Sequence, residues 1–259
     1  MYATRSSLCI VAIATLFASR SEAGGETAPE IMARSKAILQ TVADKTMLVT
    51  LHVQSSSGGE RLRSLHAFEK RTGEGRKALW VFDVPTELSG TSFLAWQRPH
   101  DRDLLWVYFP GQRRVRQLPP QVRSEEFQGS GLTYDDLAIF YFDFNGQYSL
   151  QGEKPCAGTT CYLVQTDIVD GSLAYRKLVA WIRADTFLPE RVELFGDKLL
   201  KVLTVRRAES VQGIPTVLEL ELEGVDDSYR ASVECRDVAY NTGLDDGLFT
   251  VAHLIETGH

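Results

Sequence analysis

The fold of this chain is predicted from residues 47–59, MLVTLHVQSSSGG. Apolar Met47, Val49, Leu51 and Val53 recur at every second position, which is the period of a β-strand. The serine and glycine run that follows is typical of a turn. Similar runs continue to residue 240. Short connections separate them, except for the longer stretch Pro119–Asn145, and helical crossovers of the length that parallel strands need are missing. We therefore predict a mainly β chain built as one antiparallel meander.

The remaining strands are predicted from the same alternation. They are Arg61–Lys70, Lys77–Val84, Thr91–Gln97, Leu104–Phe109, Arg113–Leu118, Tyr148–Gly152, Cys161–Ile168, Ala174–Arg183, Glu190–Phe195, Leu199–Val205, Thr216–Leu222 and Tyr229–Tyr240.

Helices are predicted at two places. Thr27 and Glu30 have the spacing of a capping box, with Pro29 in the first turn and apolar residues at helical spacing up to Val42. Thr133, followed by Asp136, resembles an N-cap with an acidic third residue and predicts a short helix there. Since no linker or internal repeat divides the chain, we predict a single domain.

The first 23 residues are predicted to be a secretory signal peptide. Arg5 supplies a positive charge, Leu8–Ala18 is an apolar run of 11 residues, and Ser21-Glu22-Ala23 fits a cleavage site after Ala23. The run is shorter than the roughly 20 residues that span a bilayer. We expect residues 24–259 to be exported to the periplasm as a soluble domain; the alternative is an uncleaved N-terminal anchor.

Composition favours an ordinary globular protein that does not bind nucleic acid. Hydrophobic residues make up 44% of the chain and charged residues 24%, and the formal net charge is −6. An acidic chain is poorly suited to the phosphate backbone of nucleic acids. The basic residues gather once, at Arg113, Arg114, Arg116 and Arg123.

The cysteines fit an oxidising compartment. Cys156 and Cys161 flank a turn-like segment between two predicted strands, and we predict a disulfide between them. The alternative, a redox or metal site, has the wrong spacing and no histidine nearby. Cys235 shares a strand face with Ala231 and Val233, and we predict a buried free thiol there.

Enzyme chemistry finds little support in the sequence. None of the five histidines has the spacing of a metal site, and the Gln128–Gly131 segment lacks the first glycine of a nucleophile elbow. The neighbouring acids Asp135 and Asp136 fit the positive end of a short helix more simply than acid–base catalysis. We therefore predict a protein that is not an enzyme and needs no cofactor.

Several segments in a fixed order resemble one family. They are GTSFLAW (90–96), DLLWVYFP (103–110), RRVR (113–116), FQGSGLTYDDL (127–137), WIRADTFLP (181–189) and GLFT (247–250) with Leu254. This order is similar to that of the outer-membrane lipoprotein-sorting protein family, a branch of the LolA-like superfamily. The resemblance extends over nearly all of residues 24–259.

The resemblance implies a strongly curved, incomplete antiparallel barrel with a few short helices covering its concave side. It implies a carrier that holds the acyl chains of a lipid or an acylated lipoprotein in an apolar hollow on the way to the outer membrane. Transient membrane contact and an inner-membrane transporter of the RND type are the implied partners. The alternative is an accessory or lipid-sensing regulatory module that docks on such a transporter.

Strands with apolar residues on both faces suggest which residues surround the hollow. Residues 77–84 and 104–109 carry more apolar side chains than a sheet with one solvated face requires. The predicted lipid-binding residues are Trp80, Phe82, Phe93, Trp96, Trp106 and Tyr108. Ordinary core packing is the alternative for each of them.

A latch over the hollow is a further hypothesis. Arg114 and Arg116 share one face of a predicted strand, and Arg113 lies on the other. We expect one or more of them to bond the acidic segment at Asp135 and Asp136, or backbone carbonyls near it. Gly129-Ser130-Gly131 would act as a pivot, and cargo would displace the contact. The alternative is an exposed ion pair with no role in gating, worth about 0–1 kcal/mol.

Overall fold

The structure is a computed structural model that describes residues 25–98, 103–119, 122, 124–127, 132–134, 136, 146–169, 174–226 and 229–256. The predicted signal peptide lies outside these residues. So do three parts of the predicted latch and basic cluster, namely Arg123, Gly129-Ser130-Gly131 and Asp135.

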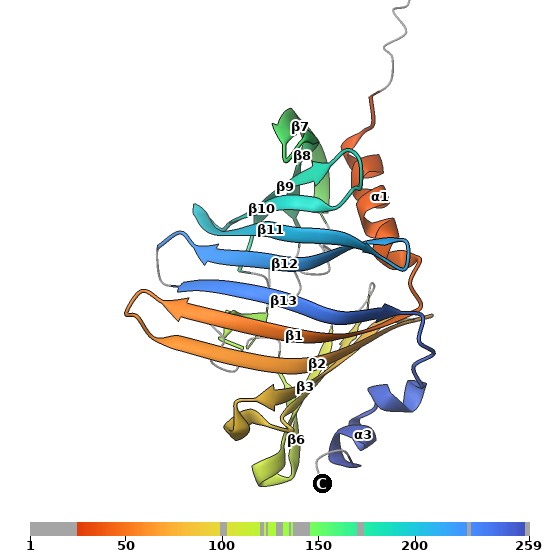
Figure 1. Cartoon of the computed structure of the whole chain (residues 1–259), viewed down its shortest axis with the longest axis vertical. Helices are drawn as coiled ribbons and strands as arrows, with labels where there is room; N and C mark the ends of the chain where they lie inside the picture. Colours follow the sequence, from red (N-terminus) through yellow and green to blue (C-terminus); the bar gives the residue numbers. More distant parts are fainter. Residues whose placement is uncertain are drawn as a thin grey trace, which may run out of the picture.

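Thirteen antiparallel strands form one sheet in the described part of the chain (Figure 1). Their order across the sheet is β6-β5-β4-β3-β2-β1-β13-β12-β11-β10-β9-β8-β7. The strands are β1 (Asp44–Ser55), β2 (Glu60–Thr72), β3 (Gly75–Val84), β4 (Ser92–Gln97), β5 (Leu104–Phe109), β6 (Arg114–Leu118), β7 (Gly146–Cys156), β8 (Thr159–Ile168), β9 (Lys177–Arg183), β10 (Pro189–Phe195), β11 (Leu199–Val211), β12 (Ile214–Gly224) and β13 (Tyr229–Tyr240).

The two halves of the chain form the two halves of this sheet. Strands β1 to β6 run outward from the middle, and β7 to β13 return from the opposite edge until β13 pairs with β1. The consecutive strands β6 and β7 therefore lie at opposite edges, and no pairing among the described residues joins them. The predicted incomplete antiparallel barrel is confirmed, and each predicted strand is present, two of them with the predicted bounds.

Alternation along the strands gives the sheet two unlike faces. Val49 pairs with Leu65 on one side and with Cys235 on the other, so these side chains share a face. This face carries the larger cluster of buried apolar residues, and we call it the inner face. The outer face of β11–β13 carries ion pairs, for example Arg230 with Glu221 and Glu223.

Helix α1 (Ala28–Gln40) lies on the inner face, where it packs across β7 and β8. The predicted helix start is confirmed, because the Thr27 N–H donates to the Glu30 carboxylate at 2.8 Å. Ile31 and Met32 are buried in the inner cluster. An amphipathic first helix thus closes part of the concave side (Figure 1).

The C-terminal segment covers the outer face instead, which the sequence did not lead us to expect. The 3-10 helix η4 (Asp246–Phe249) and the helix α3 (Val251–Glu256) bury Phe249 and Leu254 against Leu79, Leu94 and Tyr108. This second cluster explains why β3, β4 and β5 are apolar on both faces. Both faces of these strands are covered by protein.

Asp44 holds the start of this C-terminal segment. Its carboxylate accepts bonds from the Thr242 N–H and hydroxyl at 2.6 and 2.8 Å. It also accepts the N–H groups of Gly243 at 3.0 Å and Leu244 at 3.2 Å. Burial alone would raise the pKa of Asp44, but these bonds together lower it.

A disulfide joins Cys156 and Cys161 at the tip of the β7–β8 hairpin, as expected, with their Cα atoms 5.8 Å apart. Among the helices in the described ranges, none combines the length and hydropathy that crossing a bilayer requires.

Candidate ligand-binding site

An apolar cavity of about 140 Å³ lies on the inner face of the sheet. Strands β1, β2, β3, β11, β12 and β13 form most of its wall, and Leu188 and Pro189 at the start of β10 complete it. Ser35 and Ile38 of α1 and Phe127 also line the cavity. The side chains around it are mostly aliphatic, among them Met47, Leu51 and Leu220. A cavity of this lining is suited to hydrocarbon and unsuited to water.

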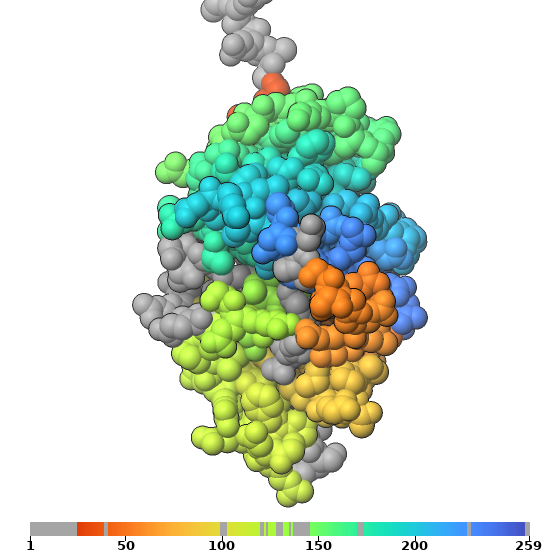
Figure 2. All heavy atoms as spheres, turned by 90° about the vertical axis from the view of Figure 1, so that its left-hand side faces the viewer, coloured from red at the N-terminus to blue at the C-terminus, as the bar shows by residue number. Residues whose placement is uncertain are grey.

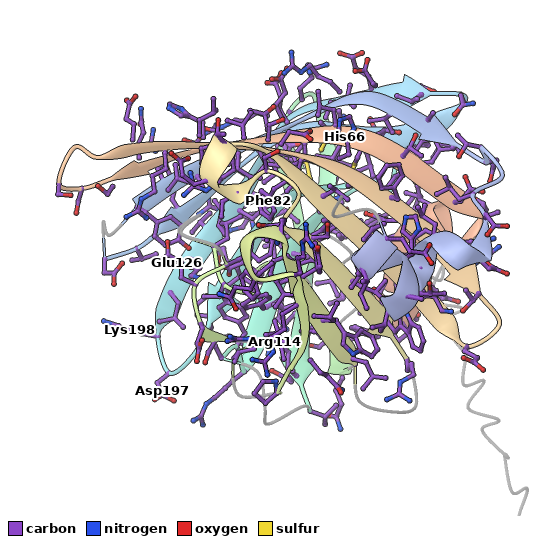
Figure 3. All side chains as sticks on the ribbon, turned by 90° about the horizontal axis from the view of Figure 1, so that it is seen from below. His66, Phe82, Arg114, Glu126, Asp197 and Lys198 are labelled. Carbon is purple, nitrogen blue, oxygen red and sulfur yellow. A yellow bond between two sulfur atoms is a disulfide. The ribbon has the colours of Figure 1, made fainter. Side chains whose placement is uncertain are left out.

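Trp80 is the predicted lipid-binding residue that lines this cavity. Phe82 and Phe93 do not line the cavity but pack in an aromatic cluster around Phe127. Their ring centroids lie 5.5 and 4.7 Å from the centroid of the Phe127 ring. Trp80 is part of the same cluster, 5.8 Å from Phe127. Figure 3 shows Phe82 within the curve of the sheet and His66 on its outer side.

Trp96, Trp106 and Tyr108 lie on the outer face, so the prediction that all six residues surround one hollow is wrong for these three. The ring centroids of Trp96 and Trp106 are 5.0 Å apart, and the Trp96 indole donates to the Phe249 carbonyl at 3.0 Å. Trp80 pairs with Phe93, and Trp96 is three positions further along, which places it on the opposite face.

One end of the cavity is polar. Lys45 Nζ lies 3.0 Å from Glu69 Oε2, and both side chains are nearly buried. The hydroxyls of Thr216 and Tyr240 share a hydrogen bond of 2.9 Å nearby. All four residues line the cavity. An amphiphilic ligand therefore meets polar groups at this end and hydrocarbon along the rest.

Cys235 lines the cavity as well. It is free, as predicted, but half-buried rather than fully buried. Burial, with smaller contributions from Glu69 and Glu234, raises its pKa to about 11. The group is therefore a neutral thiol at physiological pH, which suits an apolar wall.

The cover segment, by which we mean the described residues between 122 and 136, crosses the inner face. Phe127 and Leu132 are fully buried. The backbones of Glu126 and Thr133 pair in an isolated antiparallel β-bridge. The expected N-cap is confirmed, since the Asp136 N–H donates to the Thr133 hydroxyl at 3.1 Å and the Thr133 N–H to Asp136 at 2.6 Å.

Asp136 is completely buried and bonded to the sheet. Lys201 Nζ of β11 lies 2.7 Å from its Oδ2, and the Tyr175 hydroxyl donates to its Oδ1. Lys201 also lies above the rings of Tyr175 and Tyr229, at 5.7 and 5.5 Å from their centroids. Burial and the negative charge of Asp136 raise the pKa of Tyr229.

The predicted arginine partners of Asp136 lie elsewhere. Arg114 and Arg116 are exposed on the edge strand β6, and Arg116 donates to the Gln112 side chain at 3.1 Å. Their register places them on the face of Phe109 and Val107, which is the inner face. The pairing of either arginine with Asp136 is therefore wrong, because Lys201 occupies that position.

Lys201, Tyr175, Lys45 and Glu69 were missed from the sequence. Each stands at an inward position of a strand or its flank, where an apolar residue is the usual choice. A charged residue at such a position signals a buried partner, but the partner can be far along the chain. Lys201 and Asp136 are 65 residues apart.

Charged residues elsewhere do not form a metal site within the described ranges, where no three His, Cys, Asp or Glu side chains are grouped for one. Figure 2 views the molecule from the end where the β1–β2 hairpin tip (orange) lies next to the β12–β13 side of the sheet (blue).

Solved structures share this architecture. A DUF1329 family protein from Desulfovibrio piger is 26% identical with a TM-score of 0.81, covering 89% of this chain and 100% of that one. A putative outer membrane lipoprotein-sorting protein domain from Vibrio parahaemolyticus is 22% identical with a TM-score of 0.80, covering 87% and 97%. A LolA superfamily protein from Nitrosomonas europaea is 18% identical with a TM-score of 0.71, covering 88% and 100%.

At the level of sequence, the chain matches one family model. A family model described as an uncharacterized protein matches residues 74–256, well over half of the chain. No curated protein matches the sequence.

Proposed function

From the fold that this chain shares with LolA superfamily proteins, we propose that it is a non-catalytic carrier for lipid or acylated lipoprotein. The carrier is exported to the periplasm, where its signal peptide is removed after Ala23, and it takes its cargo towards the outer membrane. The observation that supports this most is the apolar cavity on the inner face, with Trp80 in its wall.

The size of the cavity limits how much of an acyl chain enters before the protein changes shape. An engineered apolar cavity of about 150 Å³ takes up benzene. The cavity here, about 140 Å³, therefore accommodates a few carbon atoms of a chain. A longer chain enters when α1 or the cover segment moves away from the sheet, because these elements lie on the cavity side.

Energetics indicate that such a carrier depends on partners. Sheltering an acyl chain from water gains about 0.8 kcal/mol per CH2 group. A membrane offers nearly the same gain, so transfer between membrane and carrier is close to balanced. Direction then comes from a loading partner, which we propose is an inner-membrane transporter, and from an acceptor at the outer membrane.

The test is the chemistry of what the protein carries. The protein is purified from its native envelope without detergent, and its lipid extract is analysed by mass spectrometry. Stoichiometric acyl lipid is the expected result. A stable complex with a transporter and no extractable lipid would instead identify an accessory module and overturn the carrier proposal.

A further inference from the structure

We propose that strand β6, at one edge of the sheet, is a docking site for an acidic, extended segment of a partner protein, which pairs with it as an additional antiparallel strand. The inference concerns a partner and not the cargo, so it goes beyond the carrier function and does not depend on it.

Strand β6 has a regular backbone at the edge of the sheet (Figure 1). Its five residues pair with β5 without a register shift, and no other strand of the described chain pairs with it. They include neither glycine nor proline. An edge strand of this kind presents a row of N–H and C=O groups to a further strand, so the backbone of β6 can accept one.

The opposite edge, β7, is poorly suited to such pairing. Its register is broken between Leu150 and Gly152, Pro155 lacks an N–H group, and α1 packs across it. Bulges, prolines and covering elements are common ways to protect an edge strand. Strand β6 carries charge instead, because Arg114 and Arg116 lie within it. Their charge repels a second copy of the same edge and favours an acidic strand.

The positive charge at β6 is accessible to a partner. Arg113, Arg114 and Arg116 are all exposed. Arg116 bonds the neutral Gln112 side chain and lies over the Phe109 ring, 5.8 Å from its centroid. In the part of the chain that the structure describes, neither Arg113 nor Arg114 forms an ion pair. Since the whole chain has a formal charge of −6, three cations at one edge favour an acidic partner.

The register of β6 predicts a sequence pattern for the partner. Arg114 and Arg116 lie on the inner face, whereas Val115 lies on the outer face and packs against the cluster that contains Tyr108. Side chains directly opposite each other in neighbouring strands interact, and opposite charges attract there. A matching strand therefore has acidic residues at two alternate positions and an apolar residue between them. Its main chain supplies affinity and its alternate side chains supply specificity.

The test uses a peptide with this pattern, Thr-Thr-Glu-Val-Glu-Thr-Thr, amidated at its C-terminus and labelled with tetramethylrhodamine at its N-terminus. Its affinity for the protein is measured by fluorescence anisotropy at pH 7.5 and low ionic strength, beside a peptide with lysine in place of both glutamates. We expect the acidic peptide to bind with a dissociation constant below about 1 mM and about 10-fold more tightly than the lysine peptide.

Reversing the charge of the strand should reverse this preference. In Arg114→Glu with Arg116→Glu, the lysine peptide should bind about 10-fold more tightly than the acidic one. The matched control is Arg176→Glu with Lys198→Glu, which makes the same change of charge at exposed positions outside β6. This control should retain the preference for the acidic peptide, and circular dichroism verifies that both double variants are folded.

A second comparison separates strand pairing from simple attraction between charges. An added strand uses the backbone N–H groups of every second residue. The acidic peptide is therefore N-methylated either at both glutamates or at the two threonines next to them. One modification should abolish binding to the unmodified protein, and the other should preserve it.

Equal affinity for the acidic and the lysine peptide would overturn the docking site while leaving the carrier function standing. Equal affinity for the two N-methylated peptides would also overturn it, because the contact would then be one of surface charge alone. Binding to phosphatidylglycerol vesicles that requires Arg114 and Arg116, without binding of the acidic peptide, would assign these arginines to a membrane surface and overturn the proposal as well.

Discussion

The ammonium group of Lys201 lies 2.7 Å from the carboxylate of Asp136 and joins the cover segment to strand β11 across the inner face. The carboxylate is fully buried, and the lysine side chain is 14% exposed. Tyr175 adds a hydroxyl bond to the same carboxylate. A buried ion pair with a further hydrogen bond is strongly directional, so it determines where the cover segment sits on the sheet.

Removing the lysine charge should destabilise the protein. Lys201→Met leaves the Asp136 carboxylate buried without its cation, which typically costs about 3–5 kcal/mol. Chemical denaturation followed by circular dichroism measures the loss. The matched control is Lys198→Met at the exposed tip of the β10–β11 hairpin (Figure 3), where a change within about 0.5 kcal/mol is expected.

Replacing both partners separates the charge from the packing. Lys201→Met combined with Asp136→Leu leaves no unpaired buried charge, and most of the lost stability should return. If the double variant is as unstable as the sum of the single ones, the two residues act independently and the pair does not hold the cover segment.

Trp80 should report on cargo where Trp96 and Trp106 do not. It lines the cavity, while Trp96 and Trp106 face the C-terminal segment on the outer side. A brominated fatty acid, 9,10-dibromostearate, should quench part of the tryptophan fluorescence of the unmodified protein. Quenching should disappear in Trp80→Phe and persist in Trp96→Phe and Trp106→Phe. The reverse pattern would place the acyl chain on the outer face.

Asp44→Asn should loosen the C-terminal segment. In asparagine one acceptor oxygen is replaced by an NH2 group, which faces N–H donors that it cannot satisfy. A loss of about 2 kcal/mol is expected from the broken bonds. Limited proteolysis should cut within residues 242–256 of the variant first, and unchanged protection there would contradict the role assigned to Asp44.

The same carboxylate predicts a pH dependence. Its pKa is lowered in the folded protein from an ordinary value of 3.8, so folding favours the ionised form. The stabilisation is present above that ordinary value and is lost as the pH falls below it. Between pH 5 and pH 3 the unmodified protein should therefore lose more stability than Asp44→Asn, as measured by thermal unfolding.

The disulfide should contribute to stability and not to binding. Cys156 and Cys161 close a short loop at a hairpin tip, for which chain entropy gives about 2 kcal/mol. Replacing both by serine should lower the unfolding free energy by this amount. The affinity for cis-parinaric acid should remain the same, since neither residue lines the cavity. A weaker affinity would mean that the β7–β8 hairpin takes part in holding cargo.

Bound cargo should protect the Cys235 thiol from alkylation. Because burial raises its pKa to about 11, its thiolate is scarce at pH 8 and alkylation of the folded protein should be slow. A bound acyl chain fills the space beside the thiol and should slow the reaction further. Equal alkylation rates with and without cis-parinaric acid would place the ligand away from the wall formed by β13.

Local sequence was enough for the strands, the first helix and the disulfide. Alternation at Met47–Gln54 and the capping pair Thr27–Glu30 depend on neighbouring residues, and the structure contains both elements. The cysteine pairing was predictable for the same reason, since Cys156 and Cys161 flank one turn. The six predicted lining residues were divided between two faces, because alternation shows which residues share a face and not what covers it.

By itself the sequence determined an antiparallel meander, through a two-residue apolar period that only strands satisfy, and the likeness of its motifs to a carrier family. Tertiary structure alone decided which face became the cavity wall, that the C-terminal segment covers the other face, and that Lys201 rather than Arg114 or Arg116 meets Asp136. The physical reason is distance along the chain. Contacts between neighbours follow from local geometry, whereas an ion pair spanning 65 residues exists only once the whole sheet has curved and brought its two halves together.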